Sequence, residues 1–199
     1  MIRLVLATGN PGKAKEFRAA LGAMLELSLI TDYVPGFSVV EDGATFHENA
    51  RIKSEAACAA TGLPAIADDS GLSVYYLGGD PGVYSARFAG AGASDADNNL
   101  LLLERMQHAR GKTAAHFTSV ICLKVPGQAP RFATGKMFGN ILTERRGDQG
   151  FGYDPLFQVH GDNRTLAEMA VAEKNVISHR GIALREMEGI IRQVLGGGC

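Results

Sequence analysis

The sequence predicts an α/β protein with a mixed β-sheet flanked by helices. In the first half of the chain, apolar runs alternate with helical patterns, which is typical of strands joined by crossover helices. In the second half, two strand patterns flank a turn at Pro126–Gly127, which is a hairpin signal. The chain of 199 residues has no internal repeat and no long linker, so we expect one domain over residues 1–199.

Composition argues against several classes of protein. The net charge of -1 gives no general attraction to nucleic acid or to acidic lipid, so we expect neither as a partner. No run of 18 apolar residues occurs, so we expect no membrane span. Cys58, Cys122 and Cys199 are far apart and odd in number, which supports neither a disulfide framework nor a zinc site. Our interpretation is unpaired thiols in a reducing cytoplasm.

The first strand pattern, Ile2–Ala7, runs into the turn Thr8–Gly12, and a helix is predicted from Lys13 onward. Free backbone N–H groups at a helix N-terminus favour an anion, and Lys13 adds a full positive charge. The turn is not a Walker A loop, because its glycines are too close together. A phosphate cradle and a plain strand-to-helix turn both remain open from these residues alone.

A second strand is predicted over Leu25–Thr31, followed by a loop that carries Glu41. Thr45–Glu48 has the Thr-x-x-Glu pattern of a capping box, so a helix is predicted over Phe46–Thr61. Lys53 lies on this helix, four residues after Asn49 and therefore on the same face.

Two adjacent carboxylates, Asp68 and Asp69, follow the apolar run Pro64–Ala67 and precede Ser70–Gly71. Neighbouring ionised carboxylates repel each other, so they need a cation or a shifted pKa. Mg²⁺ is a natural partner, because it takes oxygen ligands and bridges carboxylates to substrate phosphates. The alternative is a solvated turn, which these residues alone favour; the other motifs reverse that preference.

The remaining elements follow from periodicity and from turn residues. A further capping box is predicted at Thr165–Glu168. The other predicted elements are a strand over Leu72–Leu77, a helix opened by Ser94–Asp97 and running to Met106, strands over Ala114–Val125 and Arg131–Phe138, and a last helix from near Ser178 to Gly196–Gly198.

Phe151–Asp154 places two aromatic rings and a carboxylate on a glycine-containing segment. An aromatic face can stack a planar base, worth about 1–3 kcal/mol, although core aromatics are the commoner alternative. Lys174 follows on a separate segment, and His179 and Arg180 fall at the start of the last helix. Cations there oppose the helix dipole, and this local inconsistency favours a functional role.

Six stretches, taken in order, resemble the inosine triphosphate pyrophosphatase family, whose members remove non-standard purine nucleoside triphosphates from the nucleotide pool. The resemblance covers nearly the whole chain, and six motifs in the same order are very specific. It implies an elongated mixed sheet with helices, in two lobes around a central active-site cleft, and usually a homodimer. The stretches are Leu6–Lys13, Phe46–Lys53, Ala67–Gly71, Gly79–Arg87, Phe151–Phe157 and Ile177–Gly181.

The resemblance also implies the reaction and the residues that perform it. It implies Mg²⁺-dependent hydrolysis of ITP, dITP or XTP to the monophosphate and pyrophosphate in the cytoplasm. Asp69 resembles the metal ligand and proton acceptor, Glu41 and Asp68 resemble further acidic members of the metal site, and Lys13 and Lys53 resemble the catalytic lysines. The implied substrate contacts are Thr8, Gly9, Asn10, Pro11, Gly12, Lys13, Ser70, Phe151, Gly152, Tyr153, Asp154, Lys174, His179 and Arg180.

Base selection follows from hydrogen-bond donors. Hypoxanthine and xanthine carry a 6-keto acceptor that Lys174, His179 or Arg180 can meet, whereas the 6-amino group of adenine would leave buried donors unpaired. The residue that rejects guanine is not identified. Two alternatives are a pyrophosphatase for modified pyrimidine nucleotides and a non-catalytic purine-nucleotide sensor. Bare carboxylates near the site argue against a sensor without metal, because they would repel a triphosphate.

Overall fold

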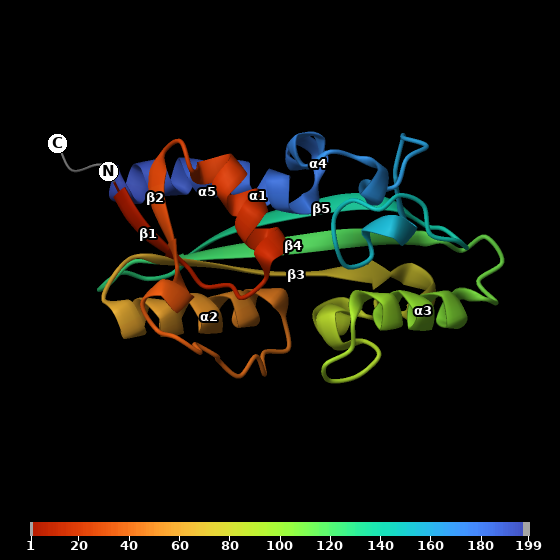
Figure 1. The fold of residues 1–199 in the computed structure, drawn as a ribbon, viewed down its shortest axis with the longest axis horizontal. Coiled ribbons are helices and arrows are strands. Elements are labelled where there is room, and N and C mark those ends of the chain that lie inside the picture. The colour runs from red at the N-terminus through yellow and green to blue at the C-terminus, as the bar shows by residue number, and fades with distance from the viewer. Residues whose placement is uncertain (1, 197–199) are drawn as a thin grey trace. The chain divides into compact units, whose positions relative to one another are not determined.

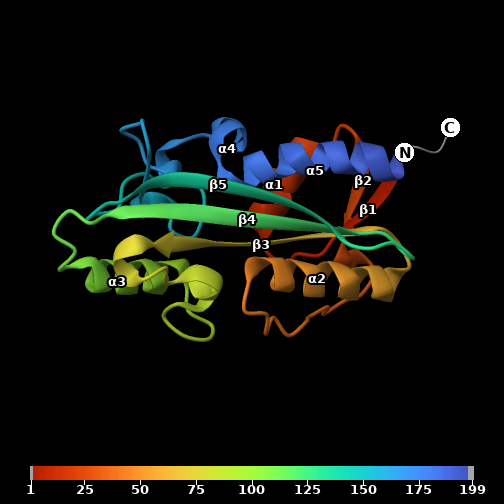
Figure 2. The ribbon, with the colours of Figure 1, turned by 180° about the vertical axis from the view of Figure 1, so that it is seen from behind.

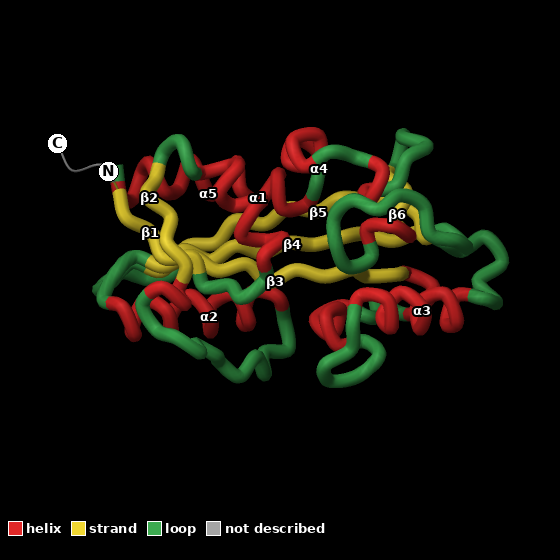
Figure 3. The backbone as a smooth tube through the Cα atoms, in the orientation of Figure 1, coloured by secondary structure: helices red, strands yellow, loops and turns green. Residues whose placement is uncertain are grey.

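The computed structural model describes residues 2–196, and in this range the strands form one sheet (Figures 1 and 3). The strand order is β2-β1-β3-β4-β5-β6. β1 pairs in parallel with β2 and β3, whereas β5 and β6 pair antiparallel, so the predicted α/β class and mixed sheet are confirmed. The strands are β1 (Ile2–Leu6), β2 (Leu25–Leu29), β3 (Ala65–Val74), β4 (Ala114–Lys124), β5 (Arg131–Ile141) and β6 (Phe157–Val159).

Helices α1 to α5 connect or follow these strands. The helix bounds are α1 (Pro11–Leu21), α2 (Phe46–Thr61), α3 (Asp95–Met106), α4 (Val171–Ile177) and α5 (His179–Leu195). Within the described residues, none of these helices is long and apolar enough to cross a membrane.

The chain divides into two compact units. Unit 1 comprises Met1–Asp69, Ser119–Gly135 and Arg180–Cys199, and unit 2 comprises Ser70–Thr118 and Lys136–His179. Strands β3, β4 and β5 each contribute residues to both units. The expected single domain, with two lobes around a central cleft, stays a prediction.

In unit 1, side chains that alternate along the strands bury both faces of the sheet. Leu6 and Ile66 pack with Phe17 of α1 in one cluster that also includes α5 residues. Ala65 and Ala67 pack instead with Ala57 of α2. Figures 1 and 2 agree that α1 and α5 cover one face of these strands and that α2 covers the other.

Unit 2 has its own apolar core. Leu72 and Val74 from the second half of β3 pack with Leu102 of α3 and with Phe157 of β6. Figures 1 and 2 show α3 and α4 on opposite faces of this part of the sheet. Within the leucine run of α3, Leu102 is fully buried in this core, whereas Leu100 is 68% exposed.

The interpretation of Asp68–Gly71 as a solvated turn is wrong, because these residues lie inside β3. The predicted strand over Leu72–Leu77 is correspondingly displaced, since β3 begins at Ala65 and residues 75–77 form a short 3-10 helix. A strand tolerates two adjacent carboxylates here because lysine and arginine side chains pair with both of them.

The other boundaries shift by a few residues. α1 begins at Pro11 rather than Lys13, because the Asn10 side chain caps it and proline suits the first helical position. β2 ends at Leu29 rather than Thr31, because a 3-10 helix begins at Ile30. β5 continues beyond Phe138 to Ile141. The short elements β6 and α4 were not predicted.

Predictions for the ends of elements and for the cysteines have mixed outcomes. The capping boxes at Thr45 and Thr165 are confirmed, although the second begins only a 3-10 turn. The last helix starts at His179 and ends at Leu195, so most of its predicted Gly196–Gly198 stop lies outside the described residues. Cys58 and Cys122 are buried free thiols, as expected, and Cys199 also lies outside the described residues.

Replacing Gly139 by alanine should destabilise the fold. A Cβ at this position would lie 2.2 Å from the Gln158 carbonyl oxygen and 2.6 Å from ring atoms of Phe157. We expect Gly139→Ala to lower the free energy of unfolding by about 1–3 kcal/mol, measured by urea denaturation.

The matched control is Gly189→Ala in α5, where a Cβ would have no neighbour within 4 Å. Because alanine has a higher helix propensity than glycine, the free energy of unfolding of this variant should rise by about 0.5–1 kcal/mol. A Gly139→Ala protein as stable as wild type would contradict the packing of β5 against β6.

Candidate active site

The turn after β1 is held open by its own side chains. Thr8 Oγ1 accepts a hydrogen bond from the Asn10 amide at 3.1 Å, and Asn10 Oδ1 accepts one from the Lys13 amide at 3.1 Å. A Cβ at Gly9 would have nothing within 4 Å. The turn therefore presents accessible backbone at the N-terminus of α1, as a phosphate cradle requires.

Asp68 is the centre of a buried charge network in unit 1. Its Oδ2 atom lies 2.7 Å from Lys13 Nζ and 3.2 Å from Arg180 Nη2, and its Oδ1 atom accepts a hydrogen bond from Ser119. Arg180 also pairs with the buried carboxylate of Glu16. Burial alone would raise the pKa of Asp68, but Arg180 and Lys13 outweigh it and hold that pKa well below its usual range.

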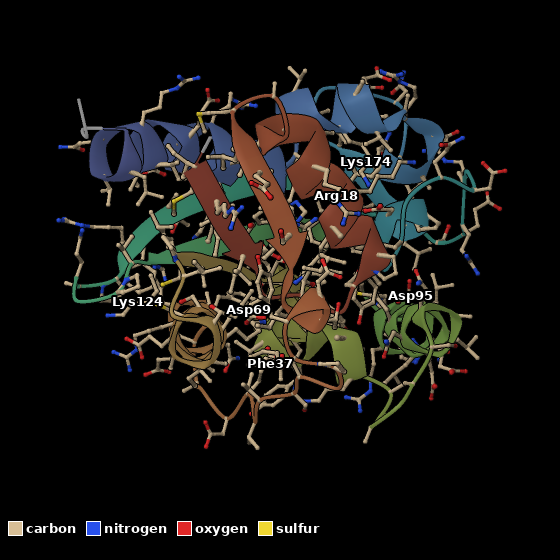
Figure 4. The ribbon with its side chains drawn as sticks, turned by 60° about the vertical axis from the view of Figure 1, so that its left-hand side comes forward. Arg18, Phe37, Asp69, Asp95, Lys124 and Lys174 are labelled. Carbon is tan, nitrogen blue, oxygen red and sulfur yellow. The ribbon has the colours of Figure 1, made fainter. Side chains whose placement is uncertain are left out.

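Asp69 faces a different set of partners. Its Oδ1 atom lies 2.9 Å from Lys53 Nζ, which also lies 2.6 Å from Glu41 Oε2. The Oδ2 atom of Asp69 is buried and has no hydrogen-bond partner among the described residues. Figure 4 shows Asp69 near α2 and near the loop that carries Phe37.

The pKa shifts of this group follow from burial and from neighbouring charges. Burial raises the pKa of Asp69 despite the opposing effects of Lys53 and Lys13. Burial acts to lower the pKa of Lys53, but two carboxylates, Asp69 and Glu41, outweigh it and raise that pKa. Lys13 has a lowered pKa because burial exceeds the attraction of Asp68. Asp69 is therefore the carboxylate of the pair that binds a proton more readily.

The predicted metal ligands Glu41, Asp68 and Asp69 do not form a single acidic cluster. Within residues 2–196, no group of three histidine, cysteine, aspartate or glutamate side chains is arranged to hold a metal ion. Glu41 and Asp69 share Lys53, whereas Asp68 pairs with Lys13 and Arg180. The unpartnered Oδ2 of Asp69, with Glu41 nearby, still offers the hard oxygen donors that suit Mg²⁺.

The nucleoside-binding segment predicted at Phe151–Asp154 lies in unit 2. Asp154 Oδ2 accepts hydrogen bonds from the Phe151 amide at 3.1 Å and from Lys174 Nζ at 2.6 Å. Lys174 Nζ lies 5.5 Å from the centroid of the Phe151 ring. Gly150 permits this approach, since a Cβ there would lie 2.1 Å from Asp154 Oδ2.

The two aromatic residues of this segment have different environments. Tyr153 is buried in the core of unit 2, and its hydroxyl donates to the Ser85 carbonyl oxygen at 2.9 Å. For Tyr153, the alternative of a core aromatic is therefore correct. Phe151 is half-buried and remains the candidate stacking platform.

His179 and Arg180 are the first residues of α5, as predicted, but they belong to different units. The His179 ring stacks on Phe117, with ring centroids 4.7 Å apart and an interplanar angle of 12°. The Arg180 guanidinium pairs with the carboxylates of Glu16 and Asp68 in unit 1. Its predicted contact with the nucleobase stays a prediction, and so does the substrate contact of Ser70, which follows Asp69 in β3.

The model of the Ham1 family matches residues 4–190. The chain belongs to the Ham1 family. The resemblance stated from the motifs is thereby confirmed.

Curated Ham1 relatives match over nearly their full length. A dITP/XTP pyrophosphatase of Thermus thermophilus is 49% identical over 190 residues, covering 94% of this chain and 90% of the relative. A dITP/XTP pyrophosphatase of Streptomyces avermitilis is 45% identical over 200 residues, covering 98% of this chain and 100% of the relative.

Solved Ham1 structures share the fold. A HAM1 protein from Coxiella burnetii has a TM-score of 0.88 at 40% identity, covering 98% of this chain and 100% of that one. The nucleoside-triphosphatase, or dITP/XTP pyrophosphatase, of Mycobacterium abscessus has a TM-score of 0.76 at 37% identity, covering 96% and 99%.

Several polar residues that contact candidate site residues in unit 1 or in unit 2 were not predicted from the sequence. Glu16 and Ser119 both contact the Asp68 network, and Asp95 and Asn99 both bind the backbone of Gly152. Glu16 lies 164 residues from its partner Arg180, so no local spacing could reveal the pair. The sequence shows that Asp95 and Asn99 are four residues apart, but this spacing does not indicate that both bind Gly152.

The two adjacent carboxylates should respond oppositely to neutralisation. Asp68→Asn removes the carboxylate that forms ion pairs with Lys13 and Arg180. We therefore expect this variant to lower the free energy of unfolding by about 3–5 kcal/mol. Asp69→Asn removes a charge that burial disfavours, so it should leave stability unchanged or raise it. Urea denaturation at pH 7 measures both, and equal losses would contradict the separation of their roles.

The pH dependence of these variants follows from the same shifts. The folded pKa of Asp68 is lowered, so its stabilisation is present above its unfolded pKa of about 3.9 and is lost as pH falls through the folded value. The deficit of Asp68→Asn should therefore shrink in acid. The folded pKa of Asp69 is raised, so ionisation costs stability as pH rises above about 4. Asp69→Asn should therefore become more stable than wild type as pH rises above about 4. Free energies of unfolding measured from pH 3 to pH 7 test both trends.

Proposed function

We propose that this protein hydrolyses ITP, dITP and XTP to the nucleoside monophosphate and pyrophosphate, and so removes these nucleotides from the pool that feeds DNA and RNA synthesis. One observation carries the proposal: Lys13 and Lys53 pair with the adjacent carboxylates Asp68 and Asp69 beside the open turn that begins at Thr8. The Ham1 relatives of Thermus thermophilus and Streptomyces avermitilis, which are dITP/XTP pyrophosphatases, support the same reaction.

The phosphate end of the substrate is assigned to unit 1. The backbone N–H groups of Gly9 and Gly12 are assigned to phosphate oxygens, because Pro11 has no N–H and the N–H groups of Thr8 and Asn10 already donate within the protein. Lys13 neutralises the charge of the phosphate. Lys53 stabilises negative charge that develops on the departing pyrophosphate. Transfer reactions at phosphorus depend mostly on such positioning and charge stabilisation.

Mg²⁺ is assigned to Asp69 and Glu41. Their carboxylates are hard donors, and the buried Oδ2 of Asp69 lacks a protein partner among the described residues. When bound, Mg²⁺ supplies positive charge that offsets the charge of the phosphate oxygens. Asp69 is also assigned as the acceptor of the proton of the attacking water.

For Asp68, the contacts favour positioning over direct metal binding. Ser119 binds one of its oxygens, and Lys13 and Arg180 bind the other. Asp68 thereby fixes the lysine that meets the triphosphate. The proposal therefore assigns Asp68 to the positioning of Lys13 instead of to the metal site, where the sequence analysis expected it.

The nucleobase is assigned to Phe151 and Lys174. Phe151 offers an aromatic face for stacking, and Lys174, oriented by Asp154, donates to a 6-keto oxygen. Adenine presents a 6-amino donor instead, which cannot accept a hydrogen bond from the Lys174 ammonium group, so ATP is disfavoured. His179 and Arg180 are further proposed contacts of the nucleoside.

The cellular setting is part of the same proposal. Two buried free thiols suit a reducing cytoplasm, where the nucleotide pool is found. A homodimer is proposed from family resemblance, and gel filtration with light scattering measures it.

The proposal is tested by pyrophosphate release from a panel of nucleoside triphosphates with Mg²⁺. We expect release from ITP, dITP and XTP in clear preference to ATP, and its loss when EDTA removes Mg²⁺. Release mainly from modified pyrimidine nucleotides would favour the first alternative. Binding without release would favour a sensor.

Asp69→Asn supplies the matching loss-of-function variant. Because it removes the proton acceptor, we expect kcat to fall by about 10²–10⁴-fold while the protein stays folded. The control is Asp162→Asn, which changes a partly exposed carboxylate that is bound to Arg164 in unit 2 and should keep full activity. Undiminished turnover by Asp69→Asn would refute its assigned role.

A further inference from the structure

We propose that Asp95 and Asn99 of α3 are positioning residues that hold the nucleobase platform by clamping the backbone of Gly152. The Gly152 amide donates to Asp95 Oδ2 at 2.7 Å, and the Gly152 carbonyl oxygen accepts from Asn99 Nδ2 at 2.8 Å. The inference rests on the proposed function, which makes Phe151 the stacking surface for the base.

Gly152 joins a residue that is anchored in the core to one that is only half-buried. On one side, Tyr153 is anchored in the core and bound to the Ser85 carbonyl. On the other side, Phe151 is half-buried. Gly152 has a φ of 62°, a left-handed conformation, and no side chain of its own. Its backbone N–H and C=O are therefore the only groups through which its orientation can be fixed.

Helix α3 places both clamping side chains on one face. Asp95 lies in the first turn, just after the Ser94 cap, and Asn99 follows four residues later. Asn99 Nδ2 also donates to the Asp95 carbonyl oxygen at 2.5 Å. Because this nitrogen meets two carbonyl oxygens, the orientation of the Asn99 amide is determined.

The chemistry of Asn99 points to this contact rather than to ordinary packing. Asn99 is 1% exposed, and its Oδ1 atom has no hydrogen-bond partner among the described residues. An apolar side chain would fill the same space without burying an unsatisfied oxygen. The asparagine is therefore explained by what its nitrogen donates to, namely the Gly152 backbone next to Phe151.

The neighbouring Asn98 provides a matched control. It is 3% exposed on the same helix, and it binds the Ala86 carbonyl and the Ala89 amide rather than Gly152. Asn98→Asp and Asn99→Asp make the same chemical change at similar burial. A merely structural role for Asn99 predicts equal effects of the two changes on substrate binding.

The test compares steady-state kinetics of these variants with ITP. Asn99→Asp replaces the donor by a carboxylate oxygen that faces two carbonyl oxygens. We expect the KM for ITP to rise about tenfold, equivalent to about 1.4 kcal/mol, with kcat changed less than about threefold. Inhibition by pyrophosphate should be unchanged, because its proposed contacts lie in unit 1. Asn98→Asp should keep KM within about twofold of wild type.

Asp95 gives a second test at an exposed position, where misfolding is not expected. Asp95→Ala removes the acceptor for the Gly152 amide, so KM should rise and hydrogen exchange of that amide should accelerate. Asp95→Asn keeps an acceptor oxygen and should restore both values toward wild type.

The outcomes separate this inference from the proposed function. A wild-type protein that releases no pyrophosphate from ITP overturns both. An active wild type overturns the clamp alone if Asn98→Asp and Asn99→Asp raise KM equally, or if Asp95→Ala leaves KM and Gly152 amide exchange unchanged.

Discussion

The alternation of side chains along β3 separates Asp68 from Asp69, and the rest of the site depends on this separation. Successive side chains of a strand point to opposite faces, so Asp68 follows Ile66 toward α1 and α5, and Asp69 follows Ala67 toward α2. Each carboxylate then finds a lysine from a different helix, Lys13 or Lys53. Two like charges adjacent in sequence are thus divided between two environments. One pKa falls and the other rises.

The sequence predicted the elements that have strong local signals. The capping box at Thr45 marked the start of α2, and the apolar run before Thr8 marked β1. It failed on β3, because Asp68–Gly71 has the composition of a turn. The residues that make a strand possible there, Lys13, Lys53 and Arg180, are supplied by other elements, so local propensity could not account for them.

The residues of the candidate site could be proposed from the sequence, but the contacts between them could not. Motifs identified Lys13, Asp69 and Lys174 without revealing which carboxylate each cation meets. The cations at the start of α5 appeared inconsistent with the helix dipole, and Arg180 is in fact balanced by Glu16 and Asp68. Ion pairs between residues more than a hundred positions apart cannot be predicted from local spacing. The hydrogen bond from Asn99 to Gly152 cannot be predicted from it either.

The two units solve the same physical problem in different ways. A side chain that is to contact a substrate must be held in place by contacts that do not occupy the atoms it uses for that purpose. In unit 1, Asp69 uses one oxygen for Lys53 and keeps the other buried and unpartnered, while Asp68 carries the structural ion pairs. In unit 2, Phe151 has no polar side-chain group to anchor, so neighbouring backbone is bound instead, by Asp154 at Phe151 itself and by α3 at Gly152. In both units, hydrogen bonds and ion pairs of neighbouring residues hold the segment that carries the candidate site residue.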